Sequence, residues 1–316
     1  MSTVSTMFHL LKKGDKLGLK KALGDKINSS WVSKAIPDKL YLRIMHNLMV
    51  GENLNLRAPK TFNEKLQWLK LYNRRHEYQR MVDKYEVKQY VSNIIGSQYV
   101  IPTLGIWNSF DEIDFDKLPN QFVLKCTHDS GSVVICKDKS TFDVKKARDK
   151  INKGMRNDLF WYGREWPYKG LKRRVLAEEY MEDTSTKELR DYKFFCFHGQ
   201  VKCCKVDFDR FIEHHANYYD TEKNILKIGE CICPPDFERE IEMPNSLDEM
   251  KKLAEMLSKN IPFLRADFYD ANGQVYFGEL TFYPASGLGR FISKENDEQL
   301  GKWLKLPEQS GGGTAS

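Results

Sequence analysis

The sequence lacks an apolar run long enough to cross a membrane, since a spanning helix needs about 20 predominantly apolar residues. Its beginning, MSTVSTMFHLLKKGDK, also lacks the apolar core and the small-residue cleavage site of a secretory signal. We therefore expect a cytoplasmic protein without a membrane span.

Paired cysteines are missing as well. The seven cysteines have no regular spacing, and Cys231 and Cys233 are too close together to be the spaced pair of a structural zinc site. His214 and His215 are not expected to share a metal ion, because adjacent residues of a strand point to opposite faces. Five cysteines in strand-like apolar segments are expected to be buried, reduced thiols: Cys126, Cys136, Cys196, Cys203 and Cys204.

No long run of one charge is present. The net charge of +6 is spread over segments of mixed sign, with one basic concentration at Lys169 and residues 172–174. This distribution suits phosphorylated small molecules better than DNA, so no nucleic-acid partner is expected. With 316 residues, of which 41% are hydrophobic, the chain can build a core of several layers.

Alternating strand patterns are absent from residues 1–82, which are expected to be helical. Pro37 and Gly51 bracket one helix, and Thr61 and Glu64 form a capping box for the next. The rest mixes helices, one of them with a capping box at Ser246, with short strands. The strands are mostly antiparallel, with reversals at residues 198–199 and 272–273. The fold class is therefore α/β in the α+β sense.

The hairpin FLRADFYDANGQVYFGELTF carries the most informative charges. Arg265 and Asp267 fall on one face of its first strand, and Glu279 and Thr281 on one face of the second. Counting from the turn puts Asp267 roughly opposite Glu279, and two facing carboxylates are unfavourable unless a cation lies between them. Carboxylate oxygens suit Mg²⁺, although an exposed polar hairpin face would also explain the pattern.

Two further segments are weak signals by themselves. In FVLKCTHDSGSVVI, Lys125 ends a strand, and a loop of small residues follows whose amides could approach phosphate. In RVLAEEYMEDTSTKELRDYKFF, a strand ends at residues 178–181, after which Asp191 and Lys193 share a strand face. An ordinary hairpin and an acidic strand end would explain these segments equally simply.

Together, the order and spacing of these segments resemble the ATP-grasp superfamily. Asp83-Lys84 before a helix and Lys125 before a Ser/Gly loop resemble D-alanine–D-alanine ligase. The likeness implies that ATP and Mg²⁺ are cofactors, that Asp267 and Glu279 bind the metal with Thr281 in place of the usual Asn, and that Arg265 is catalytic. The ATP-binding residues that it implies are Lys84, Lys125, Ser130, Gly131, Ser132, Glu178, Glu179, Met181, Asp191 and Lys193. Among these, Glu178 would bind the adenine amino group and Asp191 the ribose.

More narrowly, six fragments in order are similar to the TupA-like ATP-grasp family, which is linked to teichuronopeptide and surface-polysaccharide synthesis. They are PKTFNEKLQWLKLY, VDKYEVKQYV, FVLKCTHDSG, GREWPYK, DYKFFCFHG and FGELTFYPASG. The likeness runs from about residue 38 to 306. It implies two α+β subdomains clasping ATP, residues 83–174 with the phosphate loop and 175–306 with the adenine hinge and magnesium site. A disordered tail, residues 307–316, would follow. A helical region stands where most ATP-grasp enzymes have a Rossmann-like domain.

The resemblance implies an ATP-dependent carboxylate–amine ligase that forms an amide through an acyl phosphate. The substrates would be a small-molecule acid and amine, one of them attached to a sugar or a nucleotide sugar of a surface polysaccharide such as capsule, O-antigen or teichuronopeptide. Arg164, Tyr168, Arg210 and Ser286 are candidates for substrate binding, and a structural role is equally open for each. The sequence leaves the oligomeric state and the base for the amine open.

Two alternatives belong to other classes. A glycosyltransferase could use Asp207 and Asp209 as a D-x-D metal site, but the parallel strands of a nucleotide-sugar domain do not precede this motif. The other alternative is a non-catalytic protein that binds a nucleotide and acts as a scaffold. Its main support is that Thr281 stands where ATP-grasp enzymes usually have the metal-binding Asn.

Overall fold

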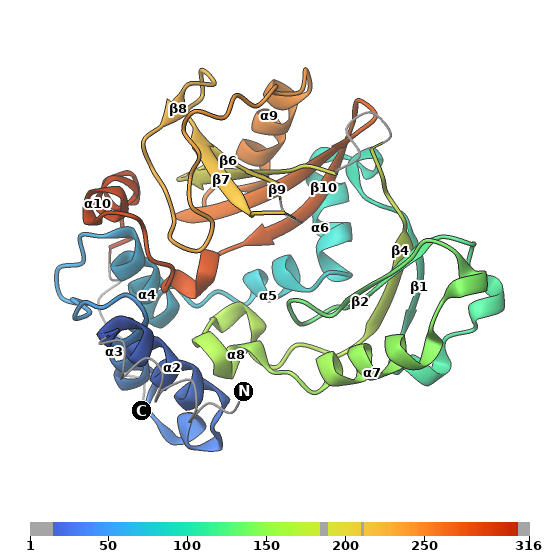
Figure 1. Ribbon diagram of the computed structural model, residues 1–316, viewed down its shortest axis with the longest axis horizontal. Coiled ribbons are helices and arrows are strands. Elements are labelled where there is room, and N and C mark those ends of the chain that lie inside the picture. Colours follow the sequence, from blue (N-terminus) through green and yellow to red (C-terminus); the bar gives the residue numbers. More distant parts are fainter. Residues whose placement is uncertain (1–14, 184–188, 210–211, 309–316) are drawn as a thin grey trace.

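The computed structural model describes residues 15–183, 189–209 and 212–308. Most of residues 307–316, the segment predicted to be a disordered tail, lies outside these ranges. Helices come first, and two antiparallel sheets follow (Figure 1). The α-helices are α2 (Lys16–Ser29), α3 (Asp38–Met49), α4 (Phe62–Tyr72), α5 (Glu77–Val82), α6 (Glu86–Ile95), α7 (Val144–Met155), α8 (Leu159–Gly163), α9 (Leu247–Leu257) and α10 (Lys294–Trp303). The 3₁₀ helices are η1 (Trp31–Ala35), η2 (Ser97–Tyr99), η3 (Phe110–Glu112), η4 (Phe115–Lys117), η5 (Lys139–Thr141), η6 (Trp166–Tyr168) and η7 (Pro284–Gly287).

The N-terminal helices form as the sequence predicts over the described part of residues 1–82. The capping box at α4 is present: the Thr61 hydroxyl accepts from the Glu64 amide at 3.2 Å, and the Glu64 carboxylate accepts from the Thr61 amide at 3.1 Å. The Phe62 ring packs edge-on against Phe263 of the larger sheet, with centroids 4.8 Å apart. The helical region therefore shares its core with the sheet that follows.

The smaller sheet has four strands in the order β1-β4-β2-β3. Helix α7 covers one of its faces and contributes the buried residues Ala147 and Ile151 to a separate core cluster. The strand that begins at Val175 pairs with β1 and β2, so this sheet continues past the boundary predicted at residue 174. Its strands are β1 (Thr103–Trp107), β2 (Phe122–Cys126), β3 (Val133–Cys136) and β4 (Val175–Glu179).

The larger sheet has six strands in the order β10-β9-β5-β6-β7-β8. Both predicted reversals are tight turns with positive φ at each central residue, 52° and 78° at His198-Gly199 and 56° and 81° at Asn272-Gly273. Helix α9 packs against β5, β6 and β9 on one face (Figure 1). The strands are β5 (Asp191–Phe197), β6 (Gln200–Phe208), β7 (His215–Tyr219), β8 (Ile225–Leu226), β9 (Phe263–Ala271) and β10 (Gln274–Thr281).

The capping box predicted at Ser246 is wrong. No side-chain cap forms there, because the Ser246 hydroxyl donates to the Asp270 carboxylate of β9. Glu249 instead accepts from the Tyr99 hydroxyl at 2.5 Å. These tertiary partners compete with the local cap and attach the start of α9 to neighbouring segments.

The predictions for buried cysteines are confirmed. Each of the five cysteines expected to be buried is buried and has a free thiol. Of the other two, Cys233 is also buried, whereas Cys231 is exposed. Among the described residues, no helix is both long enough and apolar enough to cross a membrane.

Candidate active site

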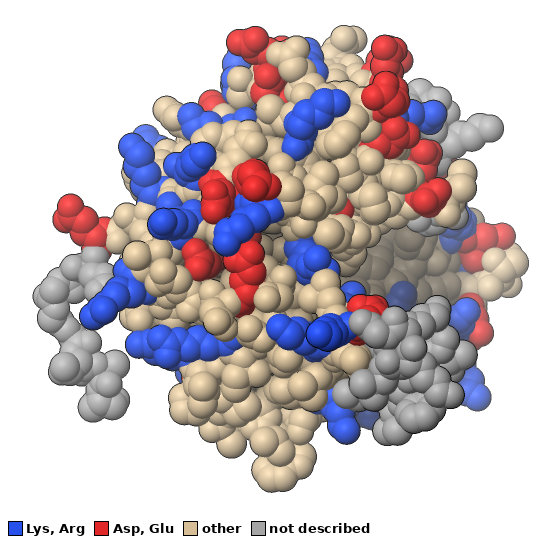
Figure 2. All heavy atoms as spheres, turned by 60° about the vertical axis from the view of Figure 1, so that its left-hand side comes forward, with Lys and Arg blue, Asp and Glu red and all other residues tan. Residues whose placement is uncertain are grey.

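A cleft of about 290 Å³ separates the two sheets. Figure 2 shows a hollow in the molecular surface bordered by Lys and Arg side chains. Seven residues of the predicted site line the cleft: Lys84, Lys125, Tyr168, Glu178, Glu179, Met181 and Glu279. The structure therefore brings together residues that are almost 200 positions apart in the sequence.

A buried carboxylate organises the lysines on the small-sheet side of the cleft. Glu178 accepts from Lys125 at 2.5 Å and from Lys88 at 2.6 Å, and it is only 7% exposed at its side chain. Although burial opposes it, the two ammonium groups hold the pKa of Glu178 below its usual range. Glu178 therefore fixes the position of Lys125 and of Lys88.

Lys84 contacts the loop that follows β2. Its amide donates to the Thr127 carbonyl at 2.9 Å, and its ammonium group donates to the Asp129 carbonyl. Burial lowers the pKa of Lys84, while the carboxylates of Glu279 and Asp129 oppose this shift. Lys84 thus interacts electrostatically with both walls of the cleft.

The predicted phosphate loop lies beyond the lining of the cleft. Ser130 and Gly131 are exposed, and Gly131 has a positive φ of 89°. The buried Ser132 hydroxyl donates to the Asp129 carboxylate. Lys84 and Asp129 therefore hold the base of this loop, while its tip faces solvent.

The end of β4 forms another wall. The Glu179 amide donates to the Pro102 carbonyl at 3.2 Å, and Tyr180 and Met181 continue along the cleft. Tyr168 enters from η6, and burial raises its pKa, with Glu165 and Glu279 adding to the effect. Of the substrate-binding candidates, Tyr168 is the one that lines this cleft.

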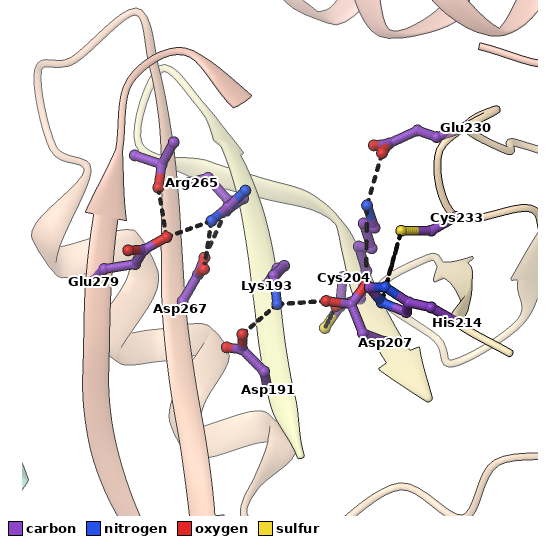
Figure 3. Close-up of polar contacts among 12 residues, drawn as sticks. Asp191, Lys193, Cys204, Asp207, His214, Glu230, Cys233, Arg265, Asp267 and Glu279 are labelled. Carbon is purple, nitrogen blue, oxygen red and sulfur yellow. Dashed lines mark hydrogen bonds and ion pairs between the residues drawn. The ribbon is translucent and has the colours of Figure 1, made fainter. Parts of the chain in front are cut away.

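Three charged side chains converge on the large-sheet side, as the hairpin pattern predicts (Figure 3). Asp267 is paired in register with Glu279, next to an irregularity at Gly278. The Arg265 guanidinium donates to both oxygens of Asp267 at 2.7 and 2.6 Å and to Glu279 at 2.7 Å. The Thr281 hydroxyl donates to the same Glu279 oxygen at 3.2 Å.

This group fits a magnesium ion by its chemistry. Asp267 is 1% exposed, and burial raises the pKa of its carboxyl against the opposing charges of Arg265 and Lys193. The carboxylates of Asp267 and Glu279 face each other, so a positive charge between them reduces their repulsion. The Arg265 guanidinium supplies this charge. Mg²⁺ prefers hard carboxylate oxygens and commonly takes one or two of them from a protein.

The charged face continues across the neighbouring strands. Lys193 lies opposite Asp267 in register, and its ammonium group contacts the carboxylates of Asp191 and of Asp207, the latter at 2.7 Å. Although burial lowers it, these surrounding carboxylates raise the pKa of Lys193 overall. Asp191 and Lys193 thus belong to a network of alternating charge that reaches from β10 to β6 (Figure 3).

A second pocket of about 170 Å³ lies against this network and is lined by Arg265. Lys205 lies in it and donates to Glu230 at 2.8 Å. Arg265 lines this pocket while contacting Asp267 and Glu279, so it connects the two cavities. The pocket is lined by Phe62, Asn63, Phe195, Lys205, Glu230, Arg265, Pro284, Ala285, Gly289 and Phe291.

A sequence model of the TupA-like ATP-grasp family matches residues 64–305, which include both sheets. The chain belongs to this family. The predicted membership and the predicted ATP-grasp fold are thereby confirmed, with a helical region before the sheets.

Solved structures that are similar to this TupA-like ATP-grasp protein include the ATP-grasp ligase PsnB complexed with a minimal precursor. It is 12% identical, with 69% of this chain and 58% of that chain covered and a TM-score of 0.38. D-alanine–D-alanine ligase from Helicobacter pylori is 15% identical, with 78% and 67% covered and a TM-score of 0.42. That from Bacillus anthracis is 16% identical, with 71% and 59% covered and a TM-score of 0.35. No curated protein sequence matches the chain.

Other predicted residues of this TupA-like ATP-grasp protein lie away from the cleft. The Arg164 side chain is fully buried and donates to the carbonyls of residues 33 and 161, which fits the structural role that the sequence left open; substrate binding by Arg164 stays a prediction. Ser286 adjoins the second pocket, but its carbonyl and hydroxyl both accept from Lys70, at 2.7 and 3.1 Å. Arg210 lies outside the described residues. Asp209 follows β6 with a φ of 53° and, within the described part of the chain, does not join Asp207 in a group of metal ligands.

Sequence reasoning missed Lys88. It lines the cleft and contacts Glu178, and its ammonium group also donates to the Ile101 carbonyl at 2.5 Å. Lys88 is in the first turns of α6, whereas Lys84 lies in the turn before this helix, so helical spacing gave no signal that the two lysines line one cleft.

Proposed function

We propose that this protein is an ATP- and magnesium-dependent carboxylate–amine ligase. The observation that carries the proposal is the cleft that sets Lys84 and Lys125 against Glu279, which Arg265 joins to Asp267. Membership of the TupA-like ATP-grasp family supports it. Cations on one wall and metal-binding carboxylates on the other are the groups needed to hold a nucleoside triphosphate.

In this proposal, the base of ATP lies beside residues 179–181, where apolar residues such as Val123 and Leu280 line the cleft. Lys84 and Lys125 contact the α- and β-phosphates, and Glu178 keeps Lys125 and Lys88 in place. Asp191 and Lys193 are assigned to the ribose side. The loop at residues 130–132 is assigned to the phosphates through its backbone amides.

Asp267 and Glu279, assisted by Thr281, would hold Mg²⁺, which would neutralise the β- and γ-phosphates when bound. The carboxylate substrate attacks the γ-phosphorus, the bond to the β–γ bridging oxygen breaks, and ADP leaves. Arg265 then faces the oxygens that gain charge, and its planar fork of donors is suited to them. A neutral amine attacks the carbonyl carbon of the acyl phosphate, and phosphate leaves with formation of the amide.

The second pocket is proposed to bind the acid that becomes phosphorylated. Arg265 connects it to the phosphate site, and Lys205 supplies a second cation. We propose that one substrate carries a sugar of a surface polysaccharide, as a nucleotide sugar or a related small molecule, and that the reaction takes place in the cytoplasm. The resemblance of the sequence fragments to the TupA-like family supports this substrate class.

Lys125→Ala is expected to weaken ATP binding by about 10- to 100-fold, because it removes a charged hydrogen bond worth about 1.5–3 kcal/mol. Isothermal titration calorimetry with Mg²⁺ measures this. Lys117→Ala is the control, since this side chain is 84% exposed on η4. Equal ATP affinity in a folded Lys125→Ala variant would remove Lys125 from the phosphate site.

Lys205→Met is expected to raise the KM for the acid by about 10-fold or more, since it removes a cation from the second pocket. The Kd for ATP should be unchanged. Lys202→Met is the matched control, because Lys202 is on the same strand but is not among the residues lining the pocket. Candidate acids are first identified by stimulated ADP release, and steady-state kinetics then give the KM. An unchanged KM in Lys205→Met would place acid binding elsewhere.

A further inference from the structure

We propose that Asp207, His214 and Cys233 form a site for a divalent metal ion of the zinc class, separate from the magnesium site. One ligand atom from each residue lies within 4.8 Å of the other two. This group cannot be recognised in the sequence, because its members come from three segments and the cysteine lacks a partner at zinc-finger spacing.

The distances match the edge of a metal-coordination tetrahedron. His214 Nε2 lies 3.6 Å from Asp207 Oδ1 and 3.6 Å from Cys233 Sγ. Bonds from zinc to nitrogen, oxygen and sulfur measure about 2.0–2.3 Å, so tetrahedral ligand atoms are separated by about 3.3–3.8 Å. Cys233 Sγ is also 3.4 Å from His214 Nδ1, so the half-exposed His214 ring would turn to direct its Nε2 lone pair at an ion shared by the three residues.

The surrounding backbone holds the three segments together. Asp207 lies near the end of β6, paired in register with Ala216 of β7. The Ala216 amide donates to the Pro234 carbonyl at 3.4 Å, and His215 Nδ1 contacts the same carbonyl at 2.9 Å. The segment that carries Cys233 is thereby attached to the start of β7, directly beside His214.

A neighbouring lysine orients the carboxylate. Lys193 contacts Asp207 Oδ2 at 2.7 Å, which leaves Oδ1 on the side of His214 (Figure 3). Hydrogen bonds of this kind to ligating groups orient them for a metal. Lys205 lies 3.9 Å from Oδ1, but it is closer to Glu230, at 2.8 Å.

Ligand type selects the class of metal. Among the described residues, the carboxylates of Asp191, Asp207 and Glu230 contact the ammonium groups of Lys193 and Lys205. Thiolate and imidazole suit zinc and related transition metals, whereas Mg²⁺ prefers oxygen alone. The His214 side chain is 39% exposed, so water or a substrate atom can complete the coordination.

Metal binding to the full chain tests the site directly. After removal of metal by a chelator, titration with Co²⁺ should give one equivalent with thiolate-to-cobalt absorption in the near ultraviolet, and Zn²⁺ should displace it. Cys233→Ser should abolish this absorption and weaken Zn²⁺ binding by roughly 100-fold or more. Cys231→Ser is the matched control from the same segment as Cys233 and should behave like the wild type, because Cys231 is exposed and is not among the three ligands.

His214→Ala provides a second test that does not remove a buried side chain. It should lose Co²⁺ affinity while retaining the circular dichroism spectrum of the wild type. Absence of stoichiometric Co²⁺ binding to the wild type, or equal binding by both ligand variants, would overturn the proposal. Calorimetry also measures the binding of Mg²⁺ and ATP to the same variants. Because these ligands belong to the proposed ligase site, their binding tests that site separately from the site of Asp207, His214 and Cys233.

Discussion

Glu279→Gln is expected to reduce the rate of acyl-phosphate formation by about 10²- to 10³-fold, the loss typical when one group that stabilises transition-state charge is removed. The substitution keeps the size of the side chain but removes the negative charge that faces Asp267 in register. It also weakens the contact to Arg265, which is 2.7 Å long. In the proposed ligase, both effects reduce stabilisation of the charge on the transferring phosphate.

Asp209→Asn is the matched control, because Asp209 follows β6 and lies outside the group around Glu279. The ligase proposal predicts only a small change for this variant. Both variants are first checked by circular dichroism and then assayed for ADP, phosphate and product mass. A product made without ATP, with activity lost in Asp209→Asn and kept in Glu279→Gln, would instead support a glycosyltransferase.

Arg164→Met is expected to destabilise the protein by about 3–5 kcal/mol, the usual cost of breaking a buried ion pair by removing one partner. The Arg164 side chain is fully buried, with its Nε 3.0 Å from Asp38. Its guanidinium donates to the carbonyls of Trp161 at 2.7 Å and Ser33 at 2.6 Å. It also lies over the Tyr41 ring, 4.1 Å from the centroid. Methionine fills the space but removes these contacts, and among the described residues it leaves the Asp38 carboxylate paired with Arg74 alone.

Chemical denaturation followed by circular dichroism measures this loss. Arg173→Met is the control, since the Arg173 side chain is 42% exposed and should contribute much less. Arg164→Met should leave the KM values of both substrates nearly unchanged at a temperature where it is folded. A raised KM without loss of stability would return Arg164 to the acceptor site.

The sequence by itself determined the features that depend on neighbouring residues. The side-chain period of a strand and the Asn272-Gly273 turn specify the register of the last hairpin as far as Phe277, which places Asp267 close to Glu279; the irregularity at Gly278 then pairs these two residues. The capping box at Thr61 and Glu64 is equally local, and it is present. The order of the fragments was sufficient to predict the family, which the family model confirmed.

Only the tertiary structure decided what lies between distant segments. It showed that Glu178 pairs with Lys88 and Lys125, and that Arg164 is buried under the N-terminal helices. The strand from Val175 pairs with β1 and β2 of the smaller sheet. Because these partners are more than 40 residues earlier in the chain, the local sequence could not show that this strand joins that sheet. The Asp207, His214 and Cys233 group depends in the same way on the pairing of β6 with β7 and on a loop that returns beside them. Local patterns specify periodicity and turns, whereas such contacts depend on how whole elements pack, which one segment of sequence does not encode.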